Sequence, residues 1–280
     1  MPGKPIFTIR RSSGWRLLDL HELWAYRELI HFLTWRDIKV RYKQTAIGIV
    51  WIILQPLALL AVFTLLFGRL AQIPSEGVPY PVFALAGLLP WQAFSRIISE
   101  SSNSLITDQR LISRVYFPRI IVPLASSLVV IFDLLISSVL LFGIVLFYNV
   151  TISPFVVWLP FFALLMLMTG LGIAFWLSAL NVEYRDVIYT IPFLTQLWFF
   201  ITPVVYPASF IPERWRLLYG LNPMTGVIGA FRWSLLGIGE SPGRILAVSM
   251  IVSAVMFFTG IVWFRNRERT FVDAIGSGGR

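Results

Sequence analysis

The chain has 280 residues, of which 57% are hydrophobic and 13% charged, with a net charge of +9 and a mean hydropathy of +0.77. Soluble domains are typically about 45–50% apolar and about 25% charged, so an ordinary soluble globular protein is excluded. A disordered chain is excluded as well, because there is ample apolar surface to bury. Cysteine is absent and only two histidines occur, so thiolate metal sites and Cys nucleophiles are excluded and no metal site is expected.

The first 45 residues precede any long apolar run and form a predicted cytoplasmic region. Within 15–43, Leu and Trp recur at steps of three and four residues with charges between them. This spacing predicts an amphipathic helix lying in the membrane interface. Arg36, Lys39 and Lys43 share one face of it, which suits a solvated or headgroup-bound surface, or contact with a cytoplasmic partner.

Residues 46–264 form a predicted all-α membrane domain of six spans, since roughly 20 helical residues cross a bilayer core. Five stretches reach that length: Ile47–Phe67, Leu124–Phe147, Phe155–Leu180, Val187–Val205 and Ile245–Phe264. A sixth, Phe83–Ser102, is weaker and contains Pro90. With both termini cytoplasmic, including a tail at 265–280, the inside segments hold 17 Lys and Arg and the outside loops hold 5, as the positive-inside rule requires.

Three ionisable residues lie within the predicted spans. Arg96 and Glu100 are four residues apart, which predicts a local ion pair on one helix face. Asp133 lies deeper, and an intramembrane carboxylate needs a partner. Arg96 is the basic residue at a comparable depth. Both a structural hydrogen bond and a functional role remain open for Asp133.

Three loops carry more pattern than a simple connection needs. Residues 104–120 are amphipathic and predict a small cytoplasmic helix docked on another surface. Residues 181–186 form a predicted tight turn, in which Glu183, Tyr184, Arg185 and Asp186 are candidates for local ion pairs, for a cytoplasmic gate or for a second partner contact. Residues 206–244 predict two short external helices, ending near Tyr219 and Leu236, that dip into the outer leaflet as a re-entrant hairpin.

The sequence lacks a phosphate-binding loop of the form G-x-x-x-x-G-K-[ST]. We therefore expect no ATP hydrolysis, no catalytic residue and no cofactor in this chain. Nucleic-acid binding is not needed to explain the basic charge, because topology and anionic lipid account for it.

Several short motifs follow one another in a characteristic order along the chain. They are Arg41–Thr45 followed by Gly48, Trp51, Leu54 and Pro56-Leu57, then Phe67-Gly68, Gly87–Trp91, Tyr116–Arg119, Asn181–Asp186, Thr202–Pro207 and Asn222–Met224. In this order and topology the chain resembles the permease subunit of bacterial polysaccharide ABC exporters, the family that exports O-antigens, capsules and teichoic acids.

The resemblance implies a homodimer in the bacterial inner membrane, paired with two copies of a cytoplasmic ATPase that binds ATP and Mg. The substrate would be a long glycan on a polyprenyl diphosphate lipid. The 104–120 segment would be the coupling helix seated on the ATPase, with its core at Asp108, Gln109, Arg110, Leu111, Ile112, Ser113 and Arg114. The external hairpin would line the exit.

Two further sets of residues suit such a substrate. Aromatic faces bind a sliding carbohydrate without much specificity, and the candidates for this path are Trp51, Trp198, Phe199, Phe200, Tyr206 and Phe210. A lipid diphosphate needs cations near the cytoplasmic entrance, and the candidates are Arg36, Lys39, Arg41 and Lys43. Packing against lipid or other helices is the competing interpretation for each aromatic residue.

Three other functions remain open from the sequence. An ABC permease for a small drug or lipid would have the same fold but would need no wide bore. An ion-coupled secondary transporter would depend on Asp133. A membrane scaffold without transport would leave the mid-span prolines and the docking loop unexplained.

Overall fold

The computed structural model describes residues 20–43, 48–184, 186–239, 241, 243–268 and 271. This part of the chain is helical and contains no strand. The helices are α1 (Leu20–Ala25), α2 (Arg27–Lys43), α3 (Gly48–Phe63), the π-helical η1 (Thr64–Leu70), α4 (Tyr80–Thr107), α5 (Gln109–Ile112), α6 (Ile121–Phe147), the 3-10 helix η2 (Pro154–Trp158), α7 (Leu159–Glu183), α8 (Val187–Ile201), the 3-10 helix η3 (Ala208–Phe210), α9 (Glu213–Tyr219), α10 (Pro223–Leu236) and α11 (Arg244–Glu268).

Five helical segments are long and apolar enough to cross a membrane. They are Val50–Leu70, Tyr80–Thr107, Ile121–Phe147, Pro154–Glu183 and Arg244–Glu268. Each matches a predicted span, including the weak one that contains Pro90. The remaining predicted span coincides with α8, which is apolar but has only 15 residues. Three expectations therefore stay predictions. They are the count of six spans, the cytoplasmic location of both termini and the bounds of the membrane domain at 46–264.

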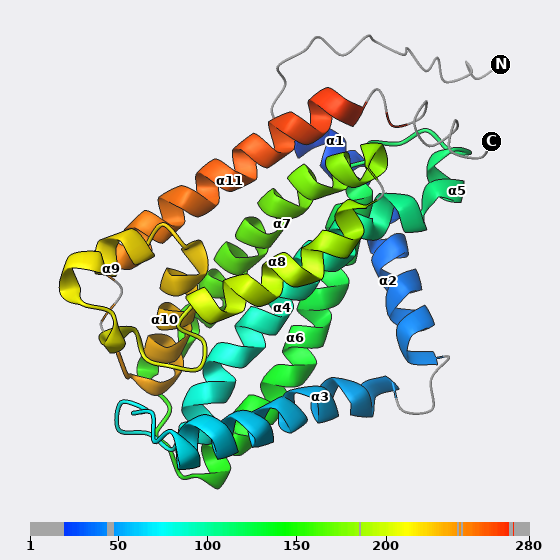
Figure 1. The fold of residues 1–280 in the computed structure, drawn as a ribbon. Coiled ribbons are helices and arrows are strands. Elements are labelled where there is room, and N and C mark those ends of the chain that lie inside the picture. Colours follow the sequence, from blue (N-terminus) through cyan, green and yellow to red (C-terminus); the bar gives the residue numbers. More distant parts are fainter. Residues whose placement is uncertain are drawn as a thin grey trace, which may run out of the picture.

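Helix α4 lies at the centre of the bundle (Figure 1). It packs against α6 and α7, and α7 packs in turn against α11. Of the most apolar 18 residues of each span, 78% are buried inside the protein in α4 but only 11% in the segment formed by α3 and η1. Apolar surface that the protein leaves uncovered must contact lipid or another chain, so α3 is the most open of the spans.

The predicted N-terminal helix consists of two pieces with a break at Tyr26. Residues 15–19 lie outside the described residues. Helix α2 packs against α6 and buries Leu33 completely, with 1% of its surface exposed, while Phe32 and Trp35 point outward. The helix thus has one face in the protein and large apolar side chains elsewhere, as an interfacial helix needs.

The two longer helices of the segment between α8 and α11 end where the sequence predicts. Helix α9 ends at Tyr219 and α10 at Leu236. The Asn222 side chain accepts a hydrogen bond from the backbone N–H of Met224 and caps α10. Gly237 ends it in the left-handed conformation, with φ of 69°. The re-entrant depth of the hairpin stays a prediction.

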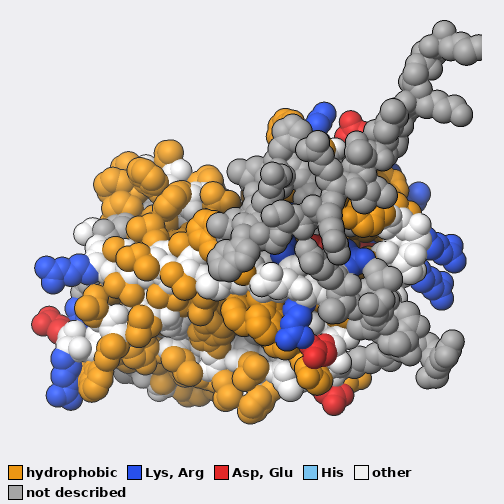
Figure 2. Space-filling model, turned by 90° about the horizontal axis from the view of Figure 1, so that it is seen from above, with side chains coloured by type: hydrophobic (Ala, Val, Ile, Leu, Met, Phe, Trp, Pro, Cys, Tyr) orange, Lys and Arg blue, Asp and Glu red, His pale blue; other side chains and the backbone are white. Residues whose placement is uncertain are grey.

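Hydrophobic and charged side chains separate on the surface. Figure 2 shows hydrophobic side chains across the middle of one face, with groups of Lys and Arg at its two ends. Figure 1 places α9 and α10 at one end of the bundle and α1, α5 and the end of α11 toward the other. This distribution is that of a membrane protein with two wet ends.

Helices α7 and α11 come closest at two glycines. A Cβ atom at Gly260 would lie 2.3 Å from the carbonyl oxygen of Gly172, and one at Gly172 would lie 2.7 Å from the backbone of Met256. Backbone cannot yield as a flexible side chain can. Small residues at such a contact let membrane helices approach closely.

We predict that Gly260→Leu lowers the free energy of unfolding by about 1–3 kcal/mol, because it forces two packed backbones apart. Thermal unfolding of the purified protein in detergent measures this. Gly143→Leu is the matched control, since a Cβ there meets nothing within 4 Å. Equal unfolding temperatures for the two variants would contradict the prediction.

Candidate functional site

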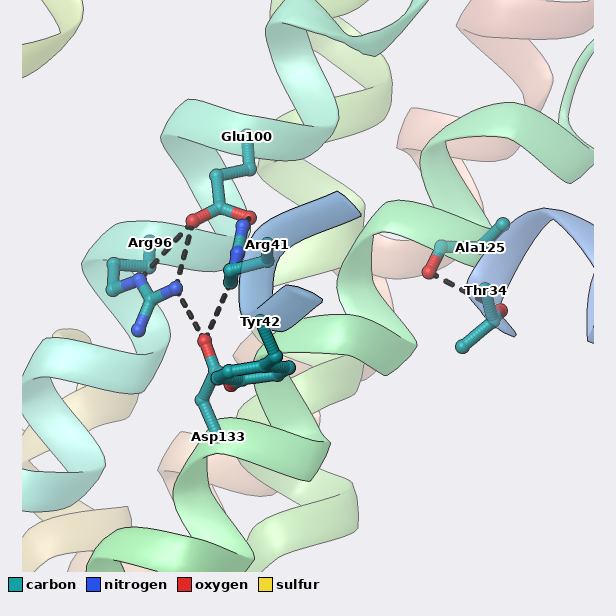
Figure 3. Close-up of polar contacts among 7 residues, drawn as sticks. All are labelled: Thr34, Arg41, Tyr42, Arg96, Glu100, Ala125 and Asp133. Atoms are coloured by element: carbon teal, nitrogen blue, oxygen red, sulfur yellow. Dashed lines mark hydrogen bonds and ion pairs between the residues drawn. The ribbon is translucent and has the colours of Figure 1, made fainter. Parts of the chain in front are cut away.

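A cluster of charged side chains joins α2, α4 and α6. The Asp133 carboxylate on α6 has 3% of its side-chain surface exposed. Its Oδ2 atom accepts hydrogen bonds from Arg41 on α2, at 2.5 Å, and from Arg96 on α4. Its Oδ1 atom accepts one from the Tyr42 hydroxyl. Figure 3 shows the three donors converging on this one carboxylate. A buried carboxylate is stable only with such partners.

Glu100 completes the cluster on the α4 side. Its carboxylate lies 2.6 Å from Nη2 of Arg41 and 3.0 Å from Nη2 of Arg96. The predicted i,i+4 pair between Arg96 and Glu100 is thus confirmed, and so is the predicted pairing of Arg96 with Asp133. Two guanidinium groups and two carboxylates balance in charge. We call Arg41, Tyr42, Arg96, Glu100 and Asp133 the anchor cluster.

The protonation of the two α2 residues follows from these contacts. Burial opposes the charged form of Arg41, but the attraction of Glu100 and Asp133 outweighs it and raises the pKa of Arg41 above its ordinary value. Burial, with the hydrogen bond to Asp133, raises the pKa of Tyr42 above its ordinary value. Arg41 therefore stays a cation and Tyr42 a neutral donor at any physiological pH.

The predicted coupling segment lies at the end of α4. Asp108 follows the last residue of α4, and its Oδ2 atom lies 2.8 Å from Nη2 of Arg36 on α2. Arg36 also contacts Asp37 at 2.8 Å. Burial opposes the charge of Arg36, but the two carboxylates raise its pKa above the ordinary value. Helix α2 is thus joined to this segment as well as to the anchor cluster.

Within the coupling segment, the side chains divide into an inner and an outer set. Ile112 is buried and Phe117 is 5% exposed. The exposed residues are Arg110, Ser113, Arg114, Val115 and Tyr116, while Gln109 and Leu111 are half-buried. Tyr116 is 88% exposed. A large aromatic side chain with so little contact inside its own chain is typical of a residue that meets a partner.

The four basic residues proposed for a lipid-diphosphate entrance occupy two kinds of position. Arg36 and Arg41 form the ion pairs described above. Lys39 and Lys43 are exposed on α2, and the Lys39 ammonium lies 5.5 Å from the centre of the Trp35 ring. The sequence pattern alone gave no reason to separate the arginines from the lysines.

The predicted tight turn at 181–186 is shorter than expected, because α7 continues to Glu183. Asn181 is buried within α7 and donates to the backbone carbonyl of Ser102 on α4. Glu183 lies 2.6 Å from Arg267 of α11. The other candidates of this turn are Tyr184 and Asp186, which are exposed, and Arg185, which lies outside the described residues.

Two of the aromatic path candidates are packed into the protein. The Trp198 ring meets Phe94 at 5.2 Å between centres, and its Nε1 donates to Oδ1 of Asn222 at 3.0 Å. Phe199 meets Trp91 and Phe63, each at 5.7 Å. These contacts tie α8 to α4 and α3 and to the start of α10. Trp91, which meets both Trp198 and Phe199, had no assigned role from the sequence.

Two other candidates meet in a hollow at the α9 end. Tyr206 and Phe210 line a space of about 410 Å³ together with Trp215 and Tyr219. Burial raises the pKa of Tyr206 to about 12, with a smaller effect of Tyr219, so its hydroxyl stays neutral. Sugar rings stack on such aromatic faces. The Tyr206 hydroxyl donates to the backbone carbonyl of Ile201 at 3.0 Å.

Trp51 and Phe200 lie apart from that hollow. Trp51 on α3 is 60% exposed and Phe200 on α8 is 61% exposed. Both helices present further large apolar side chains, including Leu54 and Phe193. Over the described residues, no group of three His, Cys, Asp or Glu could hold a metal ion.

Sequence reasoning assigned no role to Tyr42, and it placed Tyr116 in the 104–120 coupling segment but outside its core at 108–114. Tyr42 stands in the motif Arg41–Thr45, but its partner Asp133 is 91 positions away. The feature of the sequence that could have pointed to Tyr42 was a tyrosine beside an arginine on an amphipathic helix. Tyr116 stands in the Tyr116–Arg119 motif, where an aromatic residue before Phe117-Pro118 at a cytoplasmic surface was the signal.

Comparisons with known proteins place this geometry in a family. Residues 28–236 match the ABC-2 type transporter family. The chain is 28% identical to the O-antigen export system permease protein RfbA of Myxococcus xanthus, over 91% of this chain and 98% of the relative. It is 28% identical to RfbA of Klebsiella pneumoniae, over 89% and 95%. It is 25% identical to the polysialic acid transport protein KpsM of Escherichia coli, over 85% and 93%.

The family match covers well over half of the chain and includes both α2 and the coupling segment. Together with the apolar helices, it makes this a multi-pass protein of the inner membrane. The chain belongs to the ABC-2 type transporter family as a membrane-spanning permease.

Proposed function

We propose that this chain is the permease subunit of an ATP-driven exporter that moves a polysaccharide, linked to polyprenyl diphosphate, from the cytoplasmic to the outer side of the inner membrane. The observation that carries the proposal is the alignment with permeases named for O-antigen and polysialic acid export, which extends over nearly their whole length. An ABC permease for a small molecule explains this alignment less well, because the aligned relatives are named for the export of polymers.

The aromatic hollow supports a carbohydrate substrate. Tyr206, Phe210, Trp215 and Tyr219 come from the segment between α8 and α10 and surround one space. Aromatic faces with neutral hydroxyls hold successive sugars weakly, which lets a polymer slide. We propose that this hollow, with Trp51, Trp198, Phe199 and Phe200, belongs to the translocation path.

A homodimer with two cytoplasmic ATPase subunits is the proposed assembly. Members of this family work in ABC exporters with an ATPase partner. That partner would bind ATP and Mg, because the phosphate-binding loop is absent from this sequence. The open faces of α3 and α8 offer apolar surface that a second copy would cover.

The coupling segment is the proposed ATPase contact. Asp108 ties its start to Arg36, while Arg110, Arg114 and Tyr116 are exposed. A force on this segment would reach α2 through the ion pair and α4 directly through the chain. We propose Glu183, Tyr184, Arg185 and Asp186 as a second contact or gate at the same end.

The lipid diphosphate would meet the exposed cations of α2. Lys39 and Lys43 carry charges that are exposed. Arg36 and Arg41 support the same helix through their ion pairs. We propose that the lysines contact the diphosphate and that the two arginines hold α2 in place beside it.

Depletion of this protein from its host tests the function directly. We expect long glycan on polyprenyl diphosphate to build up in the inner-membrane lipid fraction while surface glycan falls, because synthesis continues without an exit. Lipid extraction followed by glycan electrophoresis measures both pools. Unchanged pools would contradict polysaccharide export, and resistance phenotypes without glycan changes would favour a small-molecule permease.

Tyr116→Ala tests the coupling contact. We expect it to weaken binding of the ATPase by about thirtyfold, as truncation of a central interface tyrosine does. Because Tyr116 is 88% exposed, the unfolding temperature of the permease alone should not change. Co-purification from membranes measures the binding.

Tyr148→Ala is the matched control for this prediction, since Tyr148 is also exposed, at 40%, but lies at the opposite end of α6 from the coupling segment. Retention of the ATPase by Tyr116→Ala would contradict the assignment of the coupling contact. Loss of the ATPase by Tyr184→Ala alone would move the main contact to the 181–186 loop.

Asp133→Asn tests the anchor cluster. Removal of this buried carboxylate leaves Arg41 and Arg96 without their shared partner, at a cost of about 3 kcal/mol. We expect α2 to separate from α6 more often. Leu33→Cys reports this, because Leu33 is 1% exposed and the chain has no other cysteine. Maleimide should label the introduced thiol more than about tenfold faster when Asp133→Asn is combined with Leu33→Cys.

Asp37→Asn is the control, because Asp37 contacts the neighbouring Arg36 in a half-exposed ion pair, which is worth at most about 1 kcal/mol. Equal labelling of the Leu33→Cys thiol in the Asp133→Asn and Asp37→Asn proteins would contradict the anchoring role.

A further inference from the structure

A cavity of about 400 Å³ lies at the α9 end, separate from the aromatic hollow. Its walls come from the loop before α4, from η3, α9 and α10, and from the start of α11. The charged residues that line it are Glu76, Glu213, Arg216, Arg232 and Arg244. Its volume is within the range of small-ligand sites. Among the described residues, the lining has three cationic and two anionic side chains.

The most deeply buried of these residues is Arg232 on α10, with 4% of its surface exposed. Its guanidinium lies over the Phe83 ring at 3.6 Å from the centre. It donates to the backbone carbonyls of Phe83, Pro203 and Val204. Within the described part of the chain, no carboxylate forms an ion pair with it. All three guanidinium nitrogens donate to these carbonyls, whose dipoles do not neutralise the charge. The Glu76 carboxylate attracts the guanidinium without forming an ion pair with it.

A second buried group in the same wall lacks a partner. Thr225 lies two turns before Arg232 on α10 and is 4% exposed. Its Oγ1 atom is buried and has no hydrogen-bond partner among the described residues. A buried hydroxyl without a partner is costly, and a bound water, ion or ligand is one way to satisfy it. A buried cation and an unsatisfied hydroxyl thus border one cavity.

We infer that this cavity binds an anionic group, a carboxylate or a phosphate, that is carried on a hydroxyl-rich ligand. The anion complements the cationic side chains of Arg232 and Arg244, and guanidinium groups bind both oxyanions through charge-assisted hydrogen bonds. Hydroxyl groups of the ligand complement Thr225 and the carboxylates of Glu76 and Glu213. Neither the family match nor the predicted translocation path assigns such a site.

Two sources supply this chemistry at the outer surface of the inner membrane. One is an acidic sugar unit of the exported glycan, and this source rests on the proposed function. The other is the headgroup of an anionic phospholipid with free hydroxyls, such as phosphatidylglycerol. The experiment below separates the two sources.

Gly229 offers a way to block the cavity without disturbing the fold. It lines the cavity on the exposed side of α10, and a Cβ there meets nothing within 4 Å. Gly229→Phe should therefore fill the space with its ring. Gly143→Phe is the matched control, because a Cβ at Gly143 on α6 also meets nothing within 4 Å.

A matched pair of charge variants complements this steric block. Arg244→Gln removes a cation from the cavity lining. Arg214→Gln removes a cation that lies over Trp215 and does not line the cavity. Both arginines are exposed, so neither variant should disturb folding.

The first arm uses the permease with its ATPase in phosphatidylcholine nanodiscs and two probes, glucuronate and glucose. Saturation-transfer NMR should detect glucuronate but not glucose. Arg244→Gln should weaken glucuronate binding by at least about tenfold, the weight of one hydrogen bond to a charged group. Gly229→Phe should abolish it, and the two control variants should bind as the unaltered protein does.

The second arm adds phosphatidylglycerol to the nanodiscs and measures lipid retained on the released complex by native mass spectrometry. Retention that Gly229→Phe abolishes and Gly143→Phe preserves assigns the anion to a lipid headgroup. Equal binding of glucose and glucuronate, with no retained phosphatidylglycerol, overturns the inference. So does binding of either anionic probe that Gly229→Phe leaves unchanged.

Failure here is distinguishable from failure of the export proposal. The binding assay needs no transport, so loss of the site leaves the glycan accumulation in depleted cells unaffected. Conversely, unchanged glycan pools on depletion would overturn polysaccharide export. Phosphatidylglycerol bound in the cavity at Gly229 would still support the inferred site.

Discussion

The carboxylate of Asp133 is the constraint on which the placement of α2 depends. A charge with 3% of its side chain exposed has no water to stabilise it, so it requires donors held at fixed positions. Arg96 is on α4, but Arg41 and Tyr42 are on α2. The carboxylate can be fully satisfied only when α2 lies along α6. The membrane core therefore determines where the interfacial helix sits, and α2 in turn holds Arg36 beside Asp108 at the coupling segment.

The two ends of the bundle use arginine in different ways. At the coupling end, Arg36, Arg41 and Arg96 bind carboxylates, and such pairs can exchange partners when helices move. At the other end, Arg232 binds three backbone carbonyls, whose positions are set by the fold. Gly87 makes room for this, since a Cβ there would lie 2.5 Å from Nη2 of Arg232. Ion pairs thus hold α2 against α4 and α6, whereas the carbonyl-bound arginine joins α4, α10 and the 202–205 loop.

Features that depend on residues close together in the sequence were predictable. The ends of α9 and α10 follow from proline, asparagine and glycine at defined positions, and the Arg96–Glu100 pair follows from helical periodicity. The contacts that α2 makes with α4 and α6 were not predictable. Arg41 lies between Lys39 and Lys43 in the sequence, so it was assigned with them and Arg36 to a lipid entrance. Its pairing with Asp133, 92 positions away, depends on how α2 packs on α6, which no pattern within α2 reveals.

The open face of α3 and α8 constrains where a polymer can pass. The centre of the bundle is filled by fully buried side chains such as Phe83, Phe94 and Ile97, and interiors packed at this density admit no hydrated chain. Under the proposed function, a glycan would therefore travel along a surface of this subunit. Helix α3 is the least buried span, and α8, at 15 residues, is too short to count among the five long spans. A second copy placed against these two helices would enclose a route lined by Trp51 and Phe200. That enclosure would lead to the end where Tyr206 and Phe210 form the aromatic hollow.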